Sequence, residues 1–266
     1  MTTPQYLFLG NNRLVKQISG TTIALTIYDD NPGFEEWHHH KNNSISLLLS
    51  GAHTENLQGR QLKRVPGDLK FIPAGVVHCC EKYMFGTRKI NLDLNEHAVS
   101  EMNISEEQLS TLSGNSLTSK FTLLKLYREL ADNDSHATAS SELLLYELFH
   151  PAISLKRKSG HTAPLWVIQL IDLLNDEWNS TFHLSDLADR LGVHSVTISR
   201  YFPLYFSSTL GSYILQIKIN KALALIKGST MPLTEIAYVC GFADQAHFTR
   251  TFKALTGYLP KQFRNV

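Results

Sequence analysis

The C-terminal third of the chain spaces its apolar residues at helical intervals. Between 233 and 240 they recur every three or four residues, and Gly241 ends the pattern, as glycine does where a helix closes in the left-handed conformation. Asp244 is a suitable N-cap for a second helix, in which Phe248 and Phe252 lie on one face. The spacing predicts two short helices joined by a tight turn, which is typical of a helix-turn-helix unit.

A second copy of this pattern lies about fifty residues earlier, at 184–202. Gly192 corresponds to Gly241 at an offset of 49, whereas Arg200 corresponds to Arg250 at an offset of 50. The turn of the second unit is therefore one residue longer. Turns tolerate insertions and packed helices do not, so the repeat predicts two related helix-turn-helix units.

In each unit, the exposed positions in the first two turns of the second helix are expected to face DNA. Arginine can fork onto guanine, glutamine onto adenine, and serine or threonine can bond to bases or phosphates. A structural tie to a neighbouring helix is the alternative role for Arg200 and Arg250. The candidate DNA-contacting residues are His194, Ser195, Thr197, Ser199 and Arg200 in the first unit, and Gln245, Ala246, Thr249, Arg250 and Lys253 in the second.

Net charge alone does not indicate a nucleic-acid partner. The chain has a formal charge of +1, and residues 160–266 contain nine Lys or Arg against seven Asp or Glu. Basic residues can still contact phosphates if they gather on one face, because local placement decides counterion release. The residues expected to do so are Arg200, Lys218, Lys221, Arg250, Lys253, Lys261 and Arg264.

Three short motifs lie near the end of the chain: a Gly-Phe pair at 241–242, Phe-x-Arg-x-Phe-Lys at 248–253, and Gly-x-x-Pro-x-x-x-Arg at 257–264. Together they strongly resemble the signature of the AraC/XylS family of bacterial transcription regulators. The resemblance covers roughly residues 165–266. It implies an all-α domain that binds double-stranded promoter DNA, and it favours an activator that contacts RNA polymerase.

The sequence also predicts helices before the first unit and between the two units. Apolar residues at 166–174 predict a helix that packs under the first unit, and those at 213–226 predict a long helix that ends at Gly228 and fixes the distance between the units. Pro203 departs from the family pattern, which usually has a basic residue there. Because proline lacks an N–H and clashes with the preceding turn, we expect the first reading helix to end or kink at Pro203.

Residues 5–95 read as short strands separated by turns that contain Gly and Pro, which predicts a sandwich or small barrel. The spacings Gly67-x5-Pro73-x-Gly75-x2-His78 and Gly33-x4-His38-x-His40 resemble the two motifs of the cupin family. The resemblance implies a cupin-like barrel. Many AraC-type regulators carry such a barrel as a sensor for an effector.

In metal-binding cupins the two motifs supply three histidines and a glutamate. His38, His40 and His78 fill the histidine places, but Ser44 stands at the glutamate place. Three imidazoles can hold a divalent metal with positions open for water or ligand, so a metal is a candidate cofactor. Of the two cysteines that follow His78, strand alternation allows only one to face such a site. The alternative is a solvated strand edge with His78 capping a turn.

A small-molecule effector would lie among inward residues of several strands. Aromatic residues at such positions more often form simple core, which is the alternative for each of them. The candidate effector-binding residues are Trp37, His38, His40, Ser46, Leu48, Phe71, His78, Tyr83 and Phe85.

The chain is long enough for two domains with separate cores, and the expected fold is α+β. We expect a cupin-like sensor at 1–154, a basic linker at 155–164, and a DNA-binding domain with two helix-turn-helix units at 165–266. Amphipathic helices between 105 and 149 are expected to pack on the barrel or to form a homodimer.

The expected function is a regulator and not an enzyme; the alternative is a cupin metalloenzyme with an appended helical domain, its chemistry carried by His38, His40 and His78. The longest apolar runs are too short to span a bilayer, and the N-terminus lacks a secretory signal, so we expect no membrane contact and a cytoplasmic protein. Three cysteines form no even framework, which favours reduced thiols.

Overall fold

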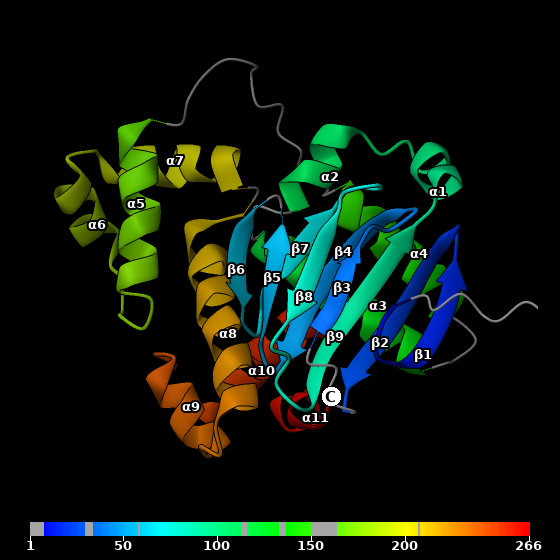
Figure 1. Ribbon diagram of the computed structural model, residues 1–266. Coiled ribbons are helices and arrows are strands. Elements are labelled where there is room, and N and C mark those ends of the chain that lie inside the picture. Colours follow the sequence, from blue (N-terminus) through cyan, green and yellow to red (C-terminus); the bar gives the residue numbers. More distant parts are fainter. Residues whose placement is uncertain are drawn as a thin grey trace, which may run out of the picture.

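The computed structural model describes residues 8–29, 34–57, 59–112, 116–132, 137–150, 164–206 and 208–266. Two antiparallel sheets face each other in the N-terminal half, helices cover one of them, and an all-helical region follows (Figure 1). The predicted α+β fold is confirmed. The predicted linker lies outside the described residues except for Pro164. Within the described ranges, no helix is long and apolar enough to cross a membrane.

The N-terminal strands form a five-stranded sheet in the order β1-β2-β9-β4-β7 and a four-stranded sheet in the order β3-β8-β5-β6. All nine strands are short and lie within residues 5–95, as predicted. The bounds are β1 Asn11–Ile18, β2 Thr21–Tyr28, β3 Phe34–His38, β4 Asn43–Ser50, β5 His53–Leu57, β6 Arg60–Arg64, β7 Leu69–Ile72, β8 His78–Glu81 and β9 Thr87–Leu94.

The helices follow the last strand. The bounds are α1 Glu96–Glu101, α2 Glu106–Leu112, α3 Leu117–Asp132, α4 Ala137–Phe149, α5 Leu165–Asp176, α6 Leu184–Leu191, α7 Ser195–Phe206, α8 Leu210–Gly228, α9 Leu233–Val239, α10 Gln245–Thr256 and α11 Pro260–Asn265.

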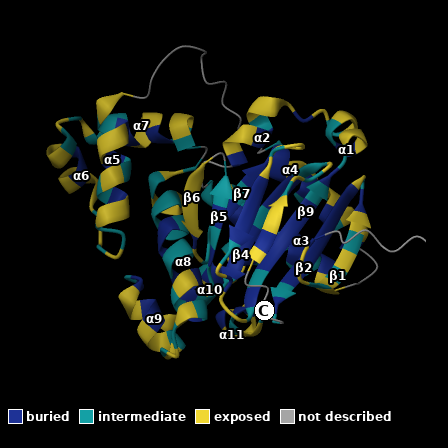
Figure 2. Ribbon diagram, in the orientation of Figure 1, coloured by how far each residue is buried: buried dark blue, intermediate teal, exposed yellow. Residues whose placement is uncertain are grey.

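The five-stranded sheet turns its apolar face outward and its polar face toward the other sheet. In β9, Ile90 and Leu92 pack into the main apolar cluster with α3 and α4, whereas Lys89 and Asn91 point into the barrel. A strand places successive side chains on opposite faces, so this alternation gives the barrel a polar interior. Strands β2, β4 and β9 are mostly dark blue in Figure 2, because helices cover the apolar face of this sheet.

Helices α3 and α4 pack against each other and against the barrel. Buried residues of α3, such as Phe121 and Leu124, belong to the same cluster as the five-stranded sheet. Intramolecular packing therefore accounts for the apolar side of α3. On α4, Leu143 and Tyr146 stay exposed.

Both helix-turn-helix units have the predicted geometry. Gly192 and Gly241 adopt left-handed φ angles of +63° and +70° at the ends of α6 and α9. Asp244 caps α10 as predicted, because its carboxylate accepts a hydrogen bond from the N–H of His247 at 2.6 Å.

Helix α7 continues past Pro203 to Phe206, so of the two expected outcomes, an end or a kink, the structure excludes an end at the proline. Phe202 is fully buried, its ring stacks on that of Phe206 at 4.5 Å, and Tyr213 of α8 meets both rings. This apolar packing across the proline compensates for the missing backbone hydrogen bond.

The apolar clusters do not divide the chain as expected. The first unit has its own cluster, built from α5, α6, α7 and the first half of α8. The second unit shares one continuous cluster with α3, α4 and the five-stranded sheet. The expectation of separate cores therefore holds for the first unit and is wrong for the second. The predicted helix at 166–174 does pack under the first unit, through Leu170 and Leu174, although Ile168 is exposed.

Candidate functional site

The second helices of the two units, α7 and α10, are the reading helices, and the first turns of both are exposed to solvent. Gln245, Ala246, Arg250 and Lys253 of the second unit are exposed, and Thr249 is half-buried. Helix α10 contacts α3 near its other end, because the following Gly257 lies against Lys125 and Arg128. In the first unit, His194, Ser199 and Arg200 are exposed, and Ser195 and Thr197 are half-buried. All ten candidate residues thus have at least part of their surface in solvent.

Several of these side chains already have partners. Gln245 accepts a hydrogen bond from the hydroxyl of Thr234 at 2.9 Å, which holds it against α9. Ser199 donates to the carbonyl of Ser195 at 3.2 Å, and the guanidinium of Arg200 lies 5.7 Å from the ring centre of Tyr201. These contacts orient the side chains without removing them from the surface.

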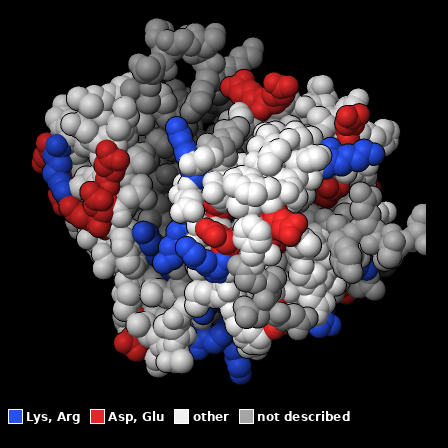
Figure 3. Space-filling model, in the orientation of Figure 1, with Lys and Arg blue, Asp and Glu red and all other residues white. Residues whose placement is uncertain are grey.

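Two of the basic side chains expected to contact phosphates instead donate hydrogen bonds to backbone carbonyls within the protein. Lys218 is buried and donates to the carbonyl of Gly241 at 2.8 Å, and Arg264 donates to the carbonyl of Met231 at 2.7 Å. The expectation of a surface contact is therefore wrong for Lys218. On the face in Figure 3, acidic side chains gather over α5 and α6, and basic ones gather near α8 and β6.

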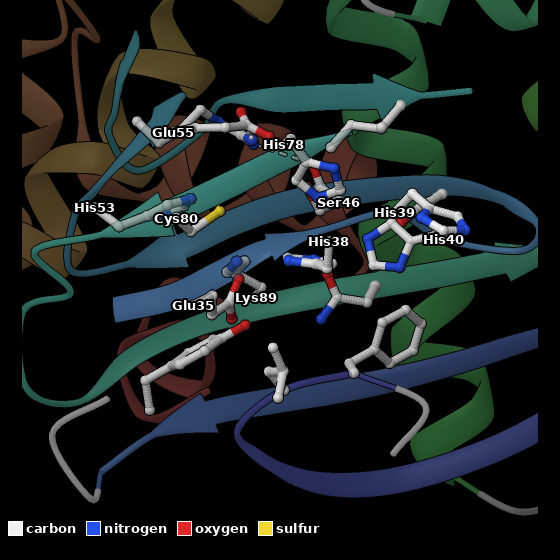
Figure 4. A pocket seen from close by; sticks show the side chains of 17 residues that line it. Glu35, His38, His39, His40, Ser46, His53, Glu55, His78, Cys80 and Lys89 are labelled. Carbon is white, nitrogen blue, oxygen red and sulfur yellow. Dashed lines mark hydrogen bonds and ion pairs between the residues drawn. The ribbon is translucent and has the colours of Figure 1, made fainter. Parts of the chain in front are cut away.

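A cavity of about 210 Å³ lies between the two sheets (Figure 4). Its lining is mostly polar, with charged and imidazole side chains from both sheets. The lining residues are Phe8, Leu9, Tyr28, Glu35, His38, His39, His40, Ser44, Ser46, His53, Glu55, Arg64, Ile72, His78, Cys80, Lys89 and Asn91.

Three histidines group together in the cavity wall. The ligand atoms of His38, His40 and His78 all lie within 4.8 Å of one another. Strand pairing explains the grouping, because His38 ends β3 directly opposite His78, the first residue of β8. Burial, and then the other two histidines, lower the pKa of His40 to about 4, and burial lowers the pKa of His78. The predicted glycine of the first motif, Gly33, lies outside the described residues.

Backbone carbonyls fix the rings of two of these histidines. Nδ1–H of His38 donates to the carbonyl of Glu36 at 2.7 Å, and Nδ1–H of His78 donates to the carbonyl of Val76 at 3.0 Å. A carbonyl only accepts, so Nδ1 carries the proton and Nε2 keeps a free lone pair. This is the arrangement in which imidazole binds metals.

Deeper in the cavity, charged groups are paired and buried. Glu55 and Arg64 form an ion pair at 3.2 Å. The ammonium of Lys89 donates to the hydroxyl of Tyr83 at 2.8 Å. Burial, and then the charges of Lys89 and Arg64, lower the pKa of His53 to about 2, so its ring is neutral.

Not all predicted effector residues reach the cavity. His38, His40, Ser46 and His78 line it. Tyr83 is buried behind Lys89, stacked between His53 and Tyr28.

Four of the aromatic or apolar residues predicted to bind the effector lie outside the cavity. Trp37 is 53% exposed, because an irregularity in the β3–β8 pairing between Glu35 and His38 turns it outward. Phe71 lies on the apolar outer face of β7, and Phe85 is 77% exposed. Leu48 is buried but does not line the cavity.

The prediction that only one of the two cysteines faces the cavity is confirmed. Cys80 faces the cavity and Cys79 does not, as strand alternation requires. Burial raises the pKa of Cys80 to about 12, so it stays a thiol, and within the described residues it does not belong to the histidine cluster. Neither cysteine completes the histidine site.

The sequence reading missed the charged interior, namely Glu35, Glu55, Arg64 and Lys89. A signal was present, since Lys89, Asn91 and Asp93 alternate with apolar residues in β9. Alternation shows that a strand has two faces, but polar residues are normally assigned to the solvent face. Only the second sheet, lying over that face, makes it an interior.

A family model described as a helix-turn-helix domain matches residues 187–265. The chain is 24% identical over 217 residues to the transcriptional activator RhaS of Escherichia fergusonii, a match that covers 80% of this chain and 70% of RhaS. In its C-terminal region the chain is similar to AraC-family regulators. The chain is also 26% identical over 133 residues to the regulator GbdR of Pseudomonas aeruginosa, covering 48% of the chain and only 36% of GbdR.

Similar solved structures include two proteins, one aligned over most of the chain and one over less than a third of it. ToxT of Vibrio cholerae aligns over 94% of this chain and 98% of its own, with 14% identity and a TM-score of 0.38. A protein of Shewanella frigidimarina that contains a cupin-2 domain aligns over 31% of this chain and 76% of its own, with 18% identity and a TM-score of 0.26. Scores this low add no geometric detail, so the placement of the site rests on the strands and helices described above.

Proposed function

We propose that the chain is a sequence-specific regulator of transcription, acting as an activator, in which α7 and α10 bind promoter DNA and the barrel binds an effector. The observation that carries the proposal is the pair of helix-turn-helix units whose reading helices begin in solvent. Helix α8 connects them. With 19 residues it is about 28 Å long, close to the roughly 34 Å between successive major grooves.

Footprinting of the full chain on DNA selected from a random-sequence pool tests this proposal. Two protected major-groove segments about one helical turn apart are the expected result. Protection that does not depend on sequence, or none at all, would contradict it.

The proposed partners are double-stranded promoter DNA and RNA polymerase, in the cytoplasm. A homodimer is also proposed, with the exposed Leu143 and Tyr146 of α4 in its contact surface.

Replacement of Arg250 by alanine is expected to weaken specific DNA binding by about 1 to 3 kcal/mol, the range for one bidentate base contact. Arg250 lies in the second turn of α10 and is exposed, so its loss leaves the core intact. The measurement is a titration of selected and unrelated duplexes at fixed salt. The control is Lys261→Ala in α11, an exposed cation outside the reading helix. Equal losses in both variants would assign Arg250 a purely electrostatic role.

The proposed effector is a small polar molecule, a divalent metal ion, or both. The cavity volume of 210 Å³ corresponds to about seven water molecules, which limits the ligand to a small one. Buried polar lining favours a guest that can replace the lost hydrogen bonds of water. The enzyme alternative draws no support from RhaS or GbdR, which are regulators.

His38, His40 and His78 fit a metal ion in chemistry and placement, since burial favours the neutral rings of His40 and His78 and the ligand atoms of all three histidines lie close together. Tetrahedral Zn²⁺ with bonds of about 2.0 to 2.1 Å needs nitrogens roughly 3.4 Å apart. The present separations reach at most 4.8 Å, so small ring rotations would suffice. A metal bound there would supply a Lewis-acidic site with positions open to an effector.

Replacement of His78 by alanine is expected to reduce Zn²⁺ affinity more than about 100-fold, since loss of a direct ligand exceeds the 10- to 100-fold cost of losing an outer hydrogen-bond partner. Metal content after dialysis and competition with a chromogenic chelator measure the effect. His97→Ala provides the matched control, because His97 lies on α1 with an exposed side chain. Unchanged stoichiometry in the His78 variant would end the metal proposal and leave DNA reading untouched.

A further inference from the structure

Arg64 joins the effector cavity to the turn that follows β6. Its Nη1 donates to Oε2 of Glu55 at 3.2 Å inside the cavity. Its Nη2 donates to the backbone carbonyls of Ser46 at 3.3 Å and Asp68 at 3.0 Å. Arg64 and Glu55 are both almost fully buried. A group that takes Glu55 away therefore leaves a buried guanidinium that must find another partner.

The turn at 65–68 is held between Arg64 and strand β4. The carboxylate of Asp68 accepts from the N–H of Val65 at 2.8 Å. The N–H of Gly67 donates to the carbonyl of Leu48 at 2.8 Å. The N–H groups of Val65, Gly67 and Asp68 are all hydrogen-bonded, so a change at Arg64 displaces the turn as a unit.

Helix α8 passes beside this turn at Asn220. Gly67 itself has no side chain, but a Cβ there would come within 3.6 Å of Oδ1 of Asn220. Lys120 of α3 donates to that oxygen at 3.4 Å. Burial lowers the pKa of Lys120 to about 8, and the charge of Asp68 opposes that lowering. The carboxylate of Asp68 in the turn therefore attracts the ammonium of Lys120, which in turn is hydrogen-bonded to Asn220 of α8.

Two residues before Asn220, Lys218 fastens α8 to the turn of the second helix-turn-helix unit. Its buried ammonium donates to the carbonyl of Gly241 at 2.8 Å. Gly241 stands three residues before Asp244, the N-cap of α10. A displacement of α8 at Asn220 is transmitted to Lys218 through less than one helical turn.

We propose that Arg64, the turn at 65–68, Asn220 and Lys218 couple occupancy of the barrel cavity to the position of helix α10. The inference rests on the regulator function proposed above and names its internal route. A ligand acts by competing with Arg64 for Glu55. It can shift the protein only as far as it binds the two arrangements unequally.

Arg64 has the two arrangements that such a switch needs. In this structure it is paired with Glu55, while its Nε lies 3.9 Å from Oδ2 of Asp68 and has no hydrogen-bond partner among the described residues. When Glu55 is occupied by a ligand, the guanidinium can close onto Asp68 and draw that carboxylate from the N–H of Val65. The movement of Asp68 then changes its attraction for Lys120, and with it the hydrogen bond of Lys120 to Asn220.

Amide hydrogen exchange of the full chain tests the route without knowledge of the natural effector. The reporters are the N–H groups of Gly241 and Phe242, which donate to carbonyls of α9 at 2.8 and 3.0 Å. Glu55→Gln, which weakens the hold on Arg64, is expected to speed their exchange about five- to tenfold. In an Asn220→Ala background the same substitution is expected to change exchange by less than about twofold, because the route is already cut.

Arg128→Ala is the matched control background. Arg128 also contacts the C-terminal helices, with its guanidinium 5.5 Å from the ring centre of Tyr258, but it lies outside the route. Glu55→Gln should keep its full effect there. An equal effect in the Asn220→Ala and Arg128→Ala backgrounds, or no effect in the natural background, overturns the proposal. If Glu55→Gln does not fold by circular dichroism, Asp68→Asn takes its place with the same expectations, since that carboxylate is partly exposed.

DNA affinity separates this inference from the proposed function. With the duplex selected by footprinting, Glu55→Gln is expected to change the Kd about fivefold in the natural background and less than twofold with Asn220→Ala. If exchange responds as expected but no variant binds DNA specifically, the route stands and the regulator function fails. If DNA is bound specifically, but the effects of Glu55→Gln and Asn220→Ala on both exchange and Kd simply add, the route fails and the regulator function stands.

Discussion

Replacement of Gly241 by alanine is expected to destabilise the protein by about 3 kcal/mol or more, whereas the same change at Gly192 costs about 1 to 2 kcal/mol. Both glycines have left-handed φ angles, so both variants carry the same backbone strain. A Cβ on Gly241 would also lie 2.3 Å from the carbonyl oxygen of Asn179 and 2.8 Å from Nζ of Lys218. A Cβ on Gly192 meets nothing within 4 Å.

Urea unfolding of the two variants measures the difference. The repeat makes them a matched pair, because each glycine ends the first helix of its unit. The Gly241 variant should also lose DNA binding, since Asn179 belongs to the segment after α5 and its clash separates the two units. Equal costs at the two positions would mean that the turn of the second unit moves freely away from Asn179, and that the close approach does not constrain it.

Replacement of Phe252 by alanine is expected to cost about 3 to 5 kcal/mol, the range for a buried phenylalanine. Phe252 is fully buried, with its ring centre 5.7 Å from those of Phe248 and Phe263. Its cluster continues into α3 and the five-stranded sheet. We therefore expect the loss to be felt in the sensor half as well, as faster amide exchange in α3.

Phe202→Ala is the control for this prediction. Phe202 is the matching residue of the first unit and is equally buried, so its removal should cost a similar amount. The buried residues of its cluster lie in α5 to α8, and the cluster touches α3 only at Leu117, the first residue of that helix. Exchange in the rest of α3 should therefore stay unchanged. The reading would be wrong if both variants loosened α3 to the same extent, because the two units would then belong to one cooperative body.

The sequence identified the helix-turn-helix units because their determinants are local. Gly241 and Asp244 define a helix end and a helix start within a few residues, and the copy at 184–202 repeats the pattern. Of the expected end or kink at Pro203, the structure excludes the end, because the packing of Phe202, Phe206 and Tyr213 supports the helix on both sides of the proline. Local rules lose where buried apolar area on both sides of the break supports the helix.

The cavity was only partly predictable. Cupin-like spacing located His38, His40 and His78, and the structure brings their ligand atoms within 4.8 Å of one another. Trp37 and Phe71 were misplaced for different reasons. A break in strand register turned the first outward, and the second faces helices that cover the outside of the sheet.

By itself the sequence determined the two helix-turn-helix units, because spacing along the chain fixes which residues share a helix face or a turn. Cupin-like spacing also pointed to His38, His40 and His78, which strand pairing then brings together. Only the tertiary structure decided that the polar face of the five-stranded sheet is an interior, and that the second unit shares its core with the sensor while the first does not. The reason is that burial depends on what lies opposite a surface. For α10 and Lys89 alike, the opposing surface comes from a distant part of the chain.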